Sequence, residues 1–151
     1  MISYIIPTRD RVETLRTTLA AIESLGDHAS GAASCGGAEV IVVDNASREM
    51  PILPRRLASG VPLRYLRRET NEGAAARNAG VRASDPDSSW IVMLDDDSYP
   101  TAPDFAEALF CQPADVWAVS ADIWLPRSGG ARESGGLPEV FIGCGVAIRR
   151  E

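Results

Sequence analysis

The sequence predicts an α/β fold in which a mostly parallel central sheet is flanked by helices. Three observations lead to this prediction. Short apolar runs rich in isoleucine and valine alternate with helical patterns, which is typical of strands joined by right-handed crossover helices. The runs are apolar at consecutive positions, as expected of strands buried on both faces. The length of 151 residues corresponds to about one domain.

The first elements are a buried strand and an amphipathic helix. Ile2–Ile6 is an apolar run that stops at Pro7, which predicts the first strand. Asp10, with Glu13 three residues later, is similar to a capping box, so we expect a helix to begin there. The apolar stripe of this helix recurs at intervals of three and four residues: Val12, Leu15, Leu19, Ile22 and Leu25.

The segment Gly26–Ala38 separates this helix from the second strand. It is rich in glycine, alanine and serine and contains the single histidine, His28, so we expect a flexible insertion with an exposed histidine. The second strand is predicted over Val40–Val43, and a turn-forming cluster begins after it at Asp44. A weaker third strand over Leu63–Leu66 is expected nearer an edge of the sheet.

The second half of the chain continues the alternation. An alanine-rich helix is predicted over Glu72–Ala83, with Asn71 placed to cap it. A fourth strand over Trp90–Leu94 ends abruptly in three aspartates. The remaining segments are shorter: a helix over Pro103–Phe110, a strand over Val116–Ala121, a loop over Pro126–Pro138 and an apolar stretch over Phe141–Ile148.

Composition excludes several classes of function. The net charge of −6 and the pI near 4.8 argue against a nucleic-acid surface. All 15 basic residues are arginine, which excludes a P-loop lysine and Schiff-base chemistry. Cys35, Cys111 and Cys144 are widely spaced, which indicates reduced thiols and neither a zinc site nor a disulfide framework. Without a basic leader or an apolar run of about 18 residues, we expect a cytoplasmic protein, with peripheral association at the inner face of the membrane as the alternative.

Three adjacent carboxylates, Asp95, Asp96 and Asp97, follow the buried fourth strand. Two such charges about 5 Å apart repel by about 3 kcal/mol at an effective dielectric constant of about 20, and a divalent cation would relieve this repulsion. Hard oxygen ligands select Mg²⁺, Mn²⁺ or Ca²⁺, and a cation with open coordination positions can also hold a diphosphate. A solvated acidic turn is the alternative interpretation.

Polar residues also follow the first two strands, at the edge of a parallel sheet where ligands bind. Residues 7–9 follow the first strand, and Asp44 and Asn45 follow the second. Taken alone, Asp44 and Asn45 are more typical of turn capping. The helix start at Asn71–Gly80 has small side chains that let a ligand or a strand approach closely, and Arg77 is available there to a phosphate or an acid.

Together, in this order and at these spacings, the motifs resemble the nucleotide-binding half of the GT-A glycosyltransferases of family 2. The matching segments are Ile5–Arg9, Val42–Ser47, Asn71–Gly80 and Leu94–Asp97, the last as the DxD element. The resemblance is strong over residues 2–100 and continues weakly to residues 141–150, which are similar to the acceptor-side segment. It implies one Rossmann-like GT-A domain, 1–151, with residues 1–100 as the nucleotide-sugar half and 101–151 as the start of the acceptor-side half.

The resemblance implies a role for each matching residue in binding a nucleotide-sugar donor. Thr8 and Asp44 would contact the nucleobase. Arg77 would lie near the base or the diphosphate, and Asp95 would contact the ribose. Asp97 would ligate the divalent cation, Mn²⁺ or Mg²⁺, that bridges the diphosphate, and Asp96 would assist either neighbour. The implied donor-binding residues are Pro7, Thr8, Arg9, Asp44, Asn45, Asn71, Gly73, Arg77, Asp95 and Asp96.

The implied reaction is an inverting transfer of the sugar to an unknown carbohydrate, lipid-linked or other hydroxyl acceptor. In family 2 the catalytic base lies on a later acidic motif, and Glu133, Glu139 and Glu151 have no matching context. We therefore expect a C-terminally incomplete chain that covers donor binding, with the base beyond Glu151. The alternatives are a nucleotidyltransferase, which usually needs a glycine-rich basic loop after the first strand, and a non-catalytic nucleotide-sugar-binding module.

Overall fold

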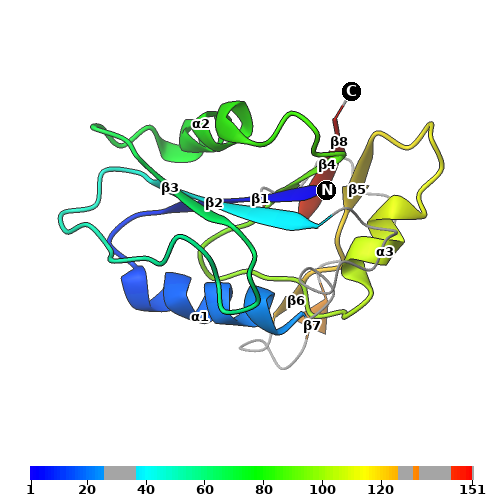
Figure 1. Cartoon of the computed structure of the whole chain (residues 1–151), viewed down its shortest axis with the longest axis horizontal. Coiled ribbons are helices and arrows are strands. Elements are labelled where there is room, and N and C mark those ends of the chain that lie inside the picture. The colour runs from blue at the N-terminus through cyan, green and yellow to red at the C-terminus, as the bar shows by residue number, and fades with distance from the viewer. Residues whose placement is uncertain (26–36, 126–130, 133–143, 151) are drawn as a thin grey trace.

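The computed structural model describes residues 1–25, 37–125, 131–132 and 144–150. A six-stranded sheet in the order β3-β2-β1-β4-β8-β5 has α1 on one face and α2 on the other (Figure 1). The elements are β1 (Ile2–Thr8), α1 (Val12–Ser24), β2 (Ala38–Asp44), β3 (Leu63–Arg67), the 3₁₀ turn η1 (Gly73–Ala75), α2 (Ala76–Ala83), β4 (Trp90–Met93), α3 (Phe105–Phe110), β5 (Ala118–Ser120), β6 (Trp124–Leu125), β7 (Ala131–Arg132) and β8 (Val146–Arg149).

The strands β3, β2, β1 and β4 are parallel, and β8 pairs antiparallel with both β4 and β5. The predicted α/β fold with a mostly parallel sheet is therefore confirmed, and β3 lies at an edge as expected. The register pairs Thr8 with Asp44, and the N–H of Leu94 donates to the carbonyl of Ile5 at 3.0 Å. The first, second and fourth strands thus end close together, which brings the segments that follow them to one edge of the sheet.

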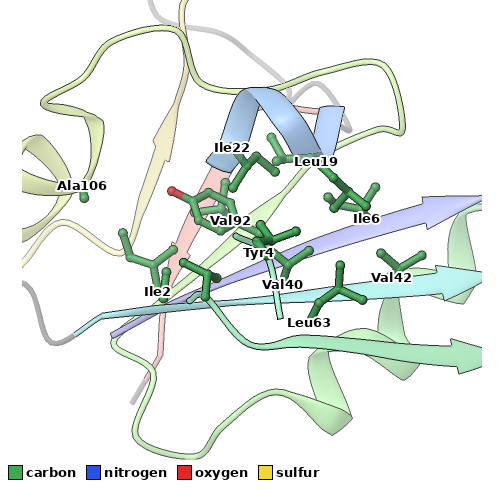
Figure 2. Close-up of a cluster of buried hydrophobic side chains, with 14 of the residues drawn as sticks. Ile2, Tyr4, Ile6, Leu19, Ile22, Val40, Val42, Leu63, Val92 and Ala106 are labelled. Atoms are coloured by element: carbon green, nitrogen blue, oxygen red, sulfur yellow. The ribbon is translucent and has the colours of Figure 1, made fainter. Parts of the chain in front are cut away.

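The consecutive apolar residues of β1 and β2 are buried because helices pack on both faces of these strands. Tyr4 and Ile6 pack with Val40 and Val42 in the cluster that contains the apolar residues of α1 (Figure 2). Ile5 points to the other face, into the cluster that contains alanines of α2. Alternate residues of one strand therefore fill two separate halves of the core.

Helix α1 buries the predicted apolar stripe, but its start differs from the prediction. Leu15, Leu19 and Ile22 are buried. Asp10 does not cap the helix: its φ is 53°, and its Oδ1 accepts a hydrogen bond from the backbone N–H of Arg48 at 2.8 Å. The predicted capping box is therefore wrong, because a tertiary contact with the segment after β2 takes up the Asp10 carboxylate.

The later elements differ from the prediction mainly at their boundaries. The helix predicted over residues 72–83 begins as η1, where Asn71 Oδ1 accepts a hydrogen bond from the N–H of Gly73 at 3.0 Å. Helix α3 and strand β5 are shorter than predicted. In the predicted loop over residues 126–138, residues 131–132 form β7, which pairs with β6.

Some predictions concern residues outside the described part of the chain. These are the insertion over residues 26–36 with His28 and Cys35, the remainder of the loop over residues 126–138, and residues 139–143. In the described part, no helix combines the length and the apolar character that crossing a membrane requires.

Candidate functional site

A cleft of about 390 Å³ lies at the edge of the sheet where β1, β2 and β4 end. All donor and cation residues predicted from the sequence line it, except Asp44. Arg11 and Ala74 also line the cleft, although the sequence patterns do not predict them. Arg11 could have been found from the sequence, because it lies two residues after Arg9 in the same segment. Four separate segments supply the lining: Pro7, Thr8, Arg9 and Arg11; Asn45; Asn71, Gly73, Ala74 and Arg77; and Asp95, Asp96 and Asp97.

Arg11 bridges two of the three aspartates. Its Nη1 lies 2.7 Å from Asp96 Oδ1, and its Nη2 donates a hydrogen bond to Asp97 Oδ2 at 2.8 Å. Asp96 is buried and also accepts a hydrogen bond from Thr8 Oγ1 at 2.8 Å. Burial, helped by the neighbouring carboxylates, raises the pKa of Asp96, although Thr8 and Arg11 act in the opposite direction. The side chain of Asp97 is 53% exposed.

Arg77 is held by α2 and pairs with Asp95. Helix α2 lies close to the sheet because Gly80 has no side chain: a Cβ there would be 2.5 Å from Ile5 Cγ2. The Nε of Arg77 is buried and has no hydrogen-bond partner within the described part of the chain. Arg11 and Arg77 together balance most of the negative charge of the three aspartates. These two arginines therefore relieve much of the repulsion between the carboxylates, which was the reason to expect a cation from the sequence.

The carboxylates of Asp95 and Asp97 are partly accessible, with 42% and 53% of their side chains exposed. Among the residues that the structure describes, no three His, Cys, Asp or Glu side chains form a group that could hold a metal ion. Mg²⁺ usually takes only one or two carboxylates and completes its coordination with water and substrate phosphates. The half-exposed carboxylate of Asp97 therefore fits a cation shared with a phosphate ligand, and the described residues form no closed protein cage.

Asn45 connects the end of β2 to the turn η1. Its Nδ2 donates to Asn71 Oδ1 at 2.7 Å and to the carbonyl of Gly73 at 3.1 Å. Its Oδ1 accepts a hydrogen bond from the N–H of Glu72 at 2.8 Å. Gly73 has a φ of 57°, which glycine adopts without steric cost. Asn45 therefore positions the backbone of this turn at the cleft.

Asp44 is the predicted donor residue that does not line the cleft. It is fully buried; its Oδ1 accepts a hydrogen bond from the N–H of Ser47 at 2.8 Å, and its Oδ2 lies 3.5 Å from Arg67 Nη1. The hydroxyl of Tyr65 also donates to Oδ2. Burial acts to raise the pKa of Asp44, but Ser47, Tyr65 and Arg67 lower it overall. In this structure Asp44 closes the turn after β2, and its contact with a nucleobase stays a prediction.

The C-terminal strand brings Cys144 next to the acidic turn. The N–H of Gly145 donates to the carbonyl of Met93 at 2.8 Å, which joins the segment before β8 to the end of β4. Burial, together with the nearby charge of Asp95, raises the pKa of the Cys144 thiol. Residues 144–150 are the described part of the segment that resembles the acceptor side. This part therefore begins next to the three aspartates.

The family model described as glycosyl transferase family 2 matches residues 3–112. This range contains every residue that the sequence predicts for the donor and the cation. A comparison with the curated proteins finds no match.

Solved structures share the fold. The mannosyltransferase PcManGT from Pyrobaculum calidifontis, in complex with GDP-Man and Mn²⁺, matches with a TM-score of 0.69 and 22% identity. The match covers 99% of this chain and 44% of the mannosyltransferase, so this chain spans less than half the length of that protein.

Two further structures show weaker likeness. 4-Diphosphocytidyl-2C-methyl-D-erythritol synthase from Anaerococcus prevotii DSM 20548 has a TM-score of 0.51 and 14% identity over 99% of this chain and 70% of the synthase. Residues 1–349 of TarS from S. aureus match with a TM-score of 0.48 and 19% identity over 72% of this chain and 31% of that TarS chain.

Proposed function

Because this chain belongs to glycosyl transferase family 2, we propose that its cleft binds a nucleotide-sugar donor and that the chain supplies the donor-binding part of a glycosyl transfer. The observation that carries this proposal is the composition of the cleft. Four segments that are separate in the sequence line one hollow of about 390 Å³. It lies at the carboxyl edge of parallel strands, where α/β proteins bind their ligands.

The walls of the cleft offer partners for both the diphosphate and the nucleoside. Arg9, Arg11 and Arg77 provide guanidinium groups, which suit the charge and geometry of phosphate oxygens. Asp95 has a partly accessible carboxylate, which could accept hydrogen bonds from the ribose hydroxyls. For the nucleobase we propose Thr8, which lines the cleft, and Asp44, which is buried beside it and would have to become accessible to make this contact.

We propose Asp97 as the protein ligand of a divalent cation, Mn²⁺ or Mg²⁺. Its half-exposed carboxylate faces the cleft with oxygen atoms of the kind that these hard cations prefer. When bound, such a cation would stabilise the charge that develops on the departing nucleoside diphosphate. The similar mannosyltransferase from P. calidifontis was solved with GDP-Man and Mn²⁺, which supports this class of ligands.

The transfer itself would be an inverting displacement at the anomeric carbon, in which a carboxylate accepts the proton of the acceptor hydroxyl. Asp95 and Asp96 already pair with Arg77 and Arg11, so neither is offered as this base. Following the resemblance, we assign the base to a motif outside the segments that line the cleft. Donor binding is therefore the function that this chain is proposed to carry.

Thermal unfolding of the 151-residue chain tests the proposal. A ligand at 100 times its Kd stabilises by about 2.7 kcal/mol, so UDP, GDP or dTDP with Mn²⁺ should raise the Tm by several degrees. Asp97→Asn should remove the part of this rise that depends on Mn²⁺. Asp87→Asn is the matched control, because Asp87 is exposed and lies outside the cleft lining.

The same experiment separates the alternatives. Stabilisation by nucleoside triphosphates in place of diphosphates would favour a nucleotidyltransferase. Stabilisation by a nucleotide sugar that is independent of Mn²⁺ would favour a non-catalytic binding module. The absence of any response to nucleotides would refute the proposed function.

A further inference from the structure

We propose that Arg11 is an internal counter-cation of the acidic turn, and that a divalent cation must displace it from Asp97 in order to bind there. This inference rests on the proposed function, since it concerns how the cation reaches its ligand. The guanidinium of Arg11 lies 2.7 Å from Asp96 and 2.8 Å from Asp97. One positive group therefore already occupies the carboxylate that is proposed to hold the metal.

The two contacts of Arg11 are not equivalent. Asp96 is only 6% exposed at its side chain and is also held by Thr8, so its negative charge needs a partner that remains in place. Asp97 is 53% exposed, and water can replace Arg11 there at little cost. Displacement of Arg11 by a cation thus requires that only the contact with Asp97 is broken.

The backbone at Arg11 is fixed while its side chain is half exposed. The N–H of Asp10 donates to Ser47 Oγ at 2.9 Å, and the carbonyl of Arg11 accepts the N–H of Leu15 at 3.0 Å. The side chain of Arg11 is 49% exposed. A change of partner is therefore a rotation of the side chain alone.

A second hollow gives Nη2 of Arg11 room to turn away from Asp97 while Nη1 stays at Asp96. This hollow, of about 260 Å³, lies between the start of α1 and the segment after β2. Arg11 lines both this hollow and the donor cleft. Asp10 and Glu49 also line this hollow, so its wall is acidic, although Asp10 already pairs with Arg48.

Arg11→Gln tests this inference through the affinity of the nucleotide-free chain for Mn²⁺, followed by electron paramagnetic resonance of the free ion. A divalent and a monovalent charge about 5 Å apart repel even at the dielectric constant of water, so removing the guanidinium should tighten Mn²⁺ binding about tenfold. Arg11→Lys keeps the charge and should stay within about twofold of the wild type.

Arg16→Gln is the matched control. Arg16 lies in α1, which begins directly after Arg11; it is 53% exposed and pairs with Glu13 at 3.6 Å, so this variant removes the same charge from a similar surface. Its Mn²⁺ affinity should match that of the wild type. An unchanged or weaker affinity in Arg11→Gln would overturn the inference. An equal gain in Arg16→Gln would also overturn it, because the effect would then come from net charge alone.

A second measurement on the wild-type chain keeps the inference testable if Arg11→Gln does not fold. The ¹⁵N signal of Arg11 Nε should shift as Mg²⁺ is added, while that of Arg16 stays in place. An Arg11 signal that does not move under saturating Mg²⁺ would overturn the inference. If nucleoside diphosphates with Mn²⁺ stabilise the chain but Arg11→Gln leaves the Mn²⁺ affinity unchanged, only the inference about Arg11 fails. If the chain binds neither Mn²⁺ nor nucleotide, the proposed function fails with it.

Discussion

At the scale of single residues, Asp44 connects the stability of the fold to the proposed donor site. A fully buried carboxylate is tolerated only when its charge is paired and its oxygens accept hydrogen bonds. Ser47, Tyr65 and Arg67 meet that requirement, and they lower the pKa of Asp44 despite its burial. The ionised form of Asp44 therefore stabilises the folded chain, whether or not a nucleobase also reaches it.

Asp44→Asn should lower the free energy of unfolding by about 1 to 3 kcal/mol at pH 7, because its amide group would face the Tyr65 hydroxyl and the Arg67 guanidinium, both donors. The pKa of Asp44 is lower in the folded chain than its ordinary value of 3.8. The stabilisation by the carboxylate is thus present above the unfolded pKa and is lost as pH falls through the folded pKa. Urea unfolding should show the difference between variant and wild type shrinking below about pH 4.

The matched control for this prediction is Asp87→Asn, since Asp87 is exposed and its carboxylate makes no hydrogen bond or ion pair with the described residues. Its stability should follow that of the wild type at every pH. A stability difference for Asp44→Asn that persists unchanged at low pH would contradict the role given to the ionised carboxylate.

At the scale of elements, η1 and α2 act as one unit that carries Gly73 and Arg77 to the cleft. The buried face of α2 consists of the small residues Ala76, Ala79 and Gly80. This face lets the helix axis lie close to β1 and β2, as the small side chains in the sequence suggest. The position of Arg77 therefore depends on a close approach of backbone to sheet.

Gly80→Ala should separate α2 from the sheet. A Cβ at Gly80 would lie 2.5 Å from Ile5 Cγ2 and 3.1 Å from Val43 Cγ2, and such overpacking typically costs about 1 to 3 kcal/mol. Because Arg77 moves with the helix, nucleoside diphosphate binding measured by calorimetry should weaken as well. Arg82→Ala, at an exposed position of the same helix, should change neither quantity. Full stability and full affinity in Gly80→Ala would show that α2 can shift without disturbing the cleft.

At the scale of the whole molecule, the sheet divides into a parallel part that supports the cleft and an antiparallel edge. The parallel strands β3, β2, β1 and β4 precede the segments that line the cleft, whereas β8 and β5 extend the sheet away from β1 (Figure 1). A ligand in the cleft therefore contacts segments that are distant in sequence but share one edge of the parallel part.

Hydrogen–deuterium exchange should reveal this division. With a nucleoside diphosphate and Mn²⁺, peptides that cover residues 7–11, 71–77 and 95–97 should exchange more slowly together. Strand β5, at the far edge, should exchange at the rate of the free chain, and it serves as the internal reference. Protection limited to one of the three segments, or protection of β5, would contradict a single donor cleft at this edge.

Local patterns were sufficient to predict the central elements of the fold. The apolar runs at Ile2–Ile6 and Val40–Val43 predict strands buried on both faces, and the stripe through Leu15, Leu19 and Ile22 predicts the buried face of α1. Parallel strands end at one edge, so the polar residues that follow them can be assigned to one site from the sequence. The match to glycosyl transferase family 2 confirms the resemblance that these motifs carry.

By itself, the sequence determined most of the residues that gather at this edge of the sheet, though not Arg11 or Ala74, and only the tertiary structure decided which of them pair. Asp10 meets the backbone of Arg48 in place of the helix start, Asp44 turns away from the cleft towards Tyr65, and Arg11 reaches Asp97 across 86 positions of the chain. Hydrophobic periodicity is a local property, because it follows from the repeat of a strand or a helix. The partner of a carboxylate is set by whichever donor the packing of distant segments brings within about 3 Å, and no local pattern encodes that choice.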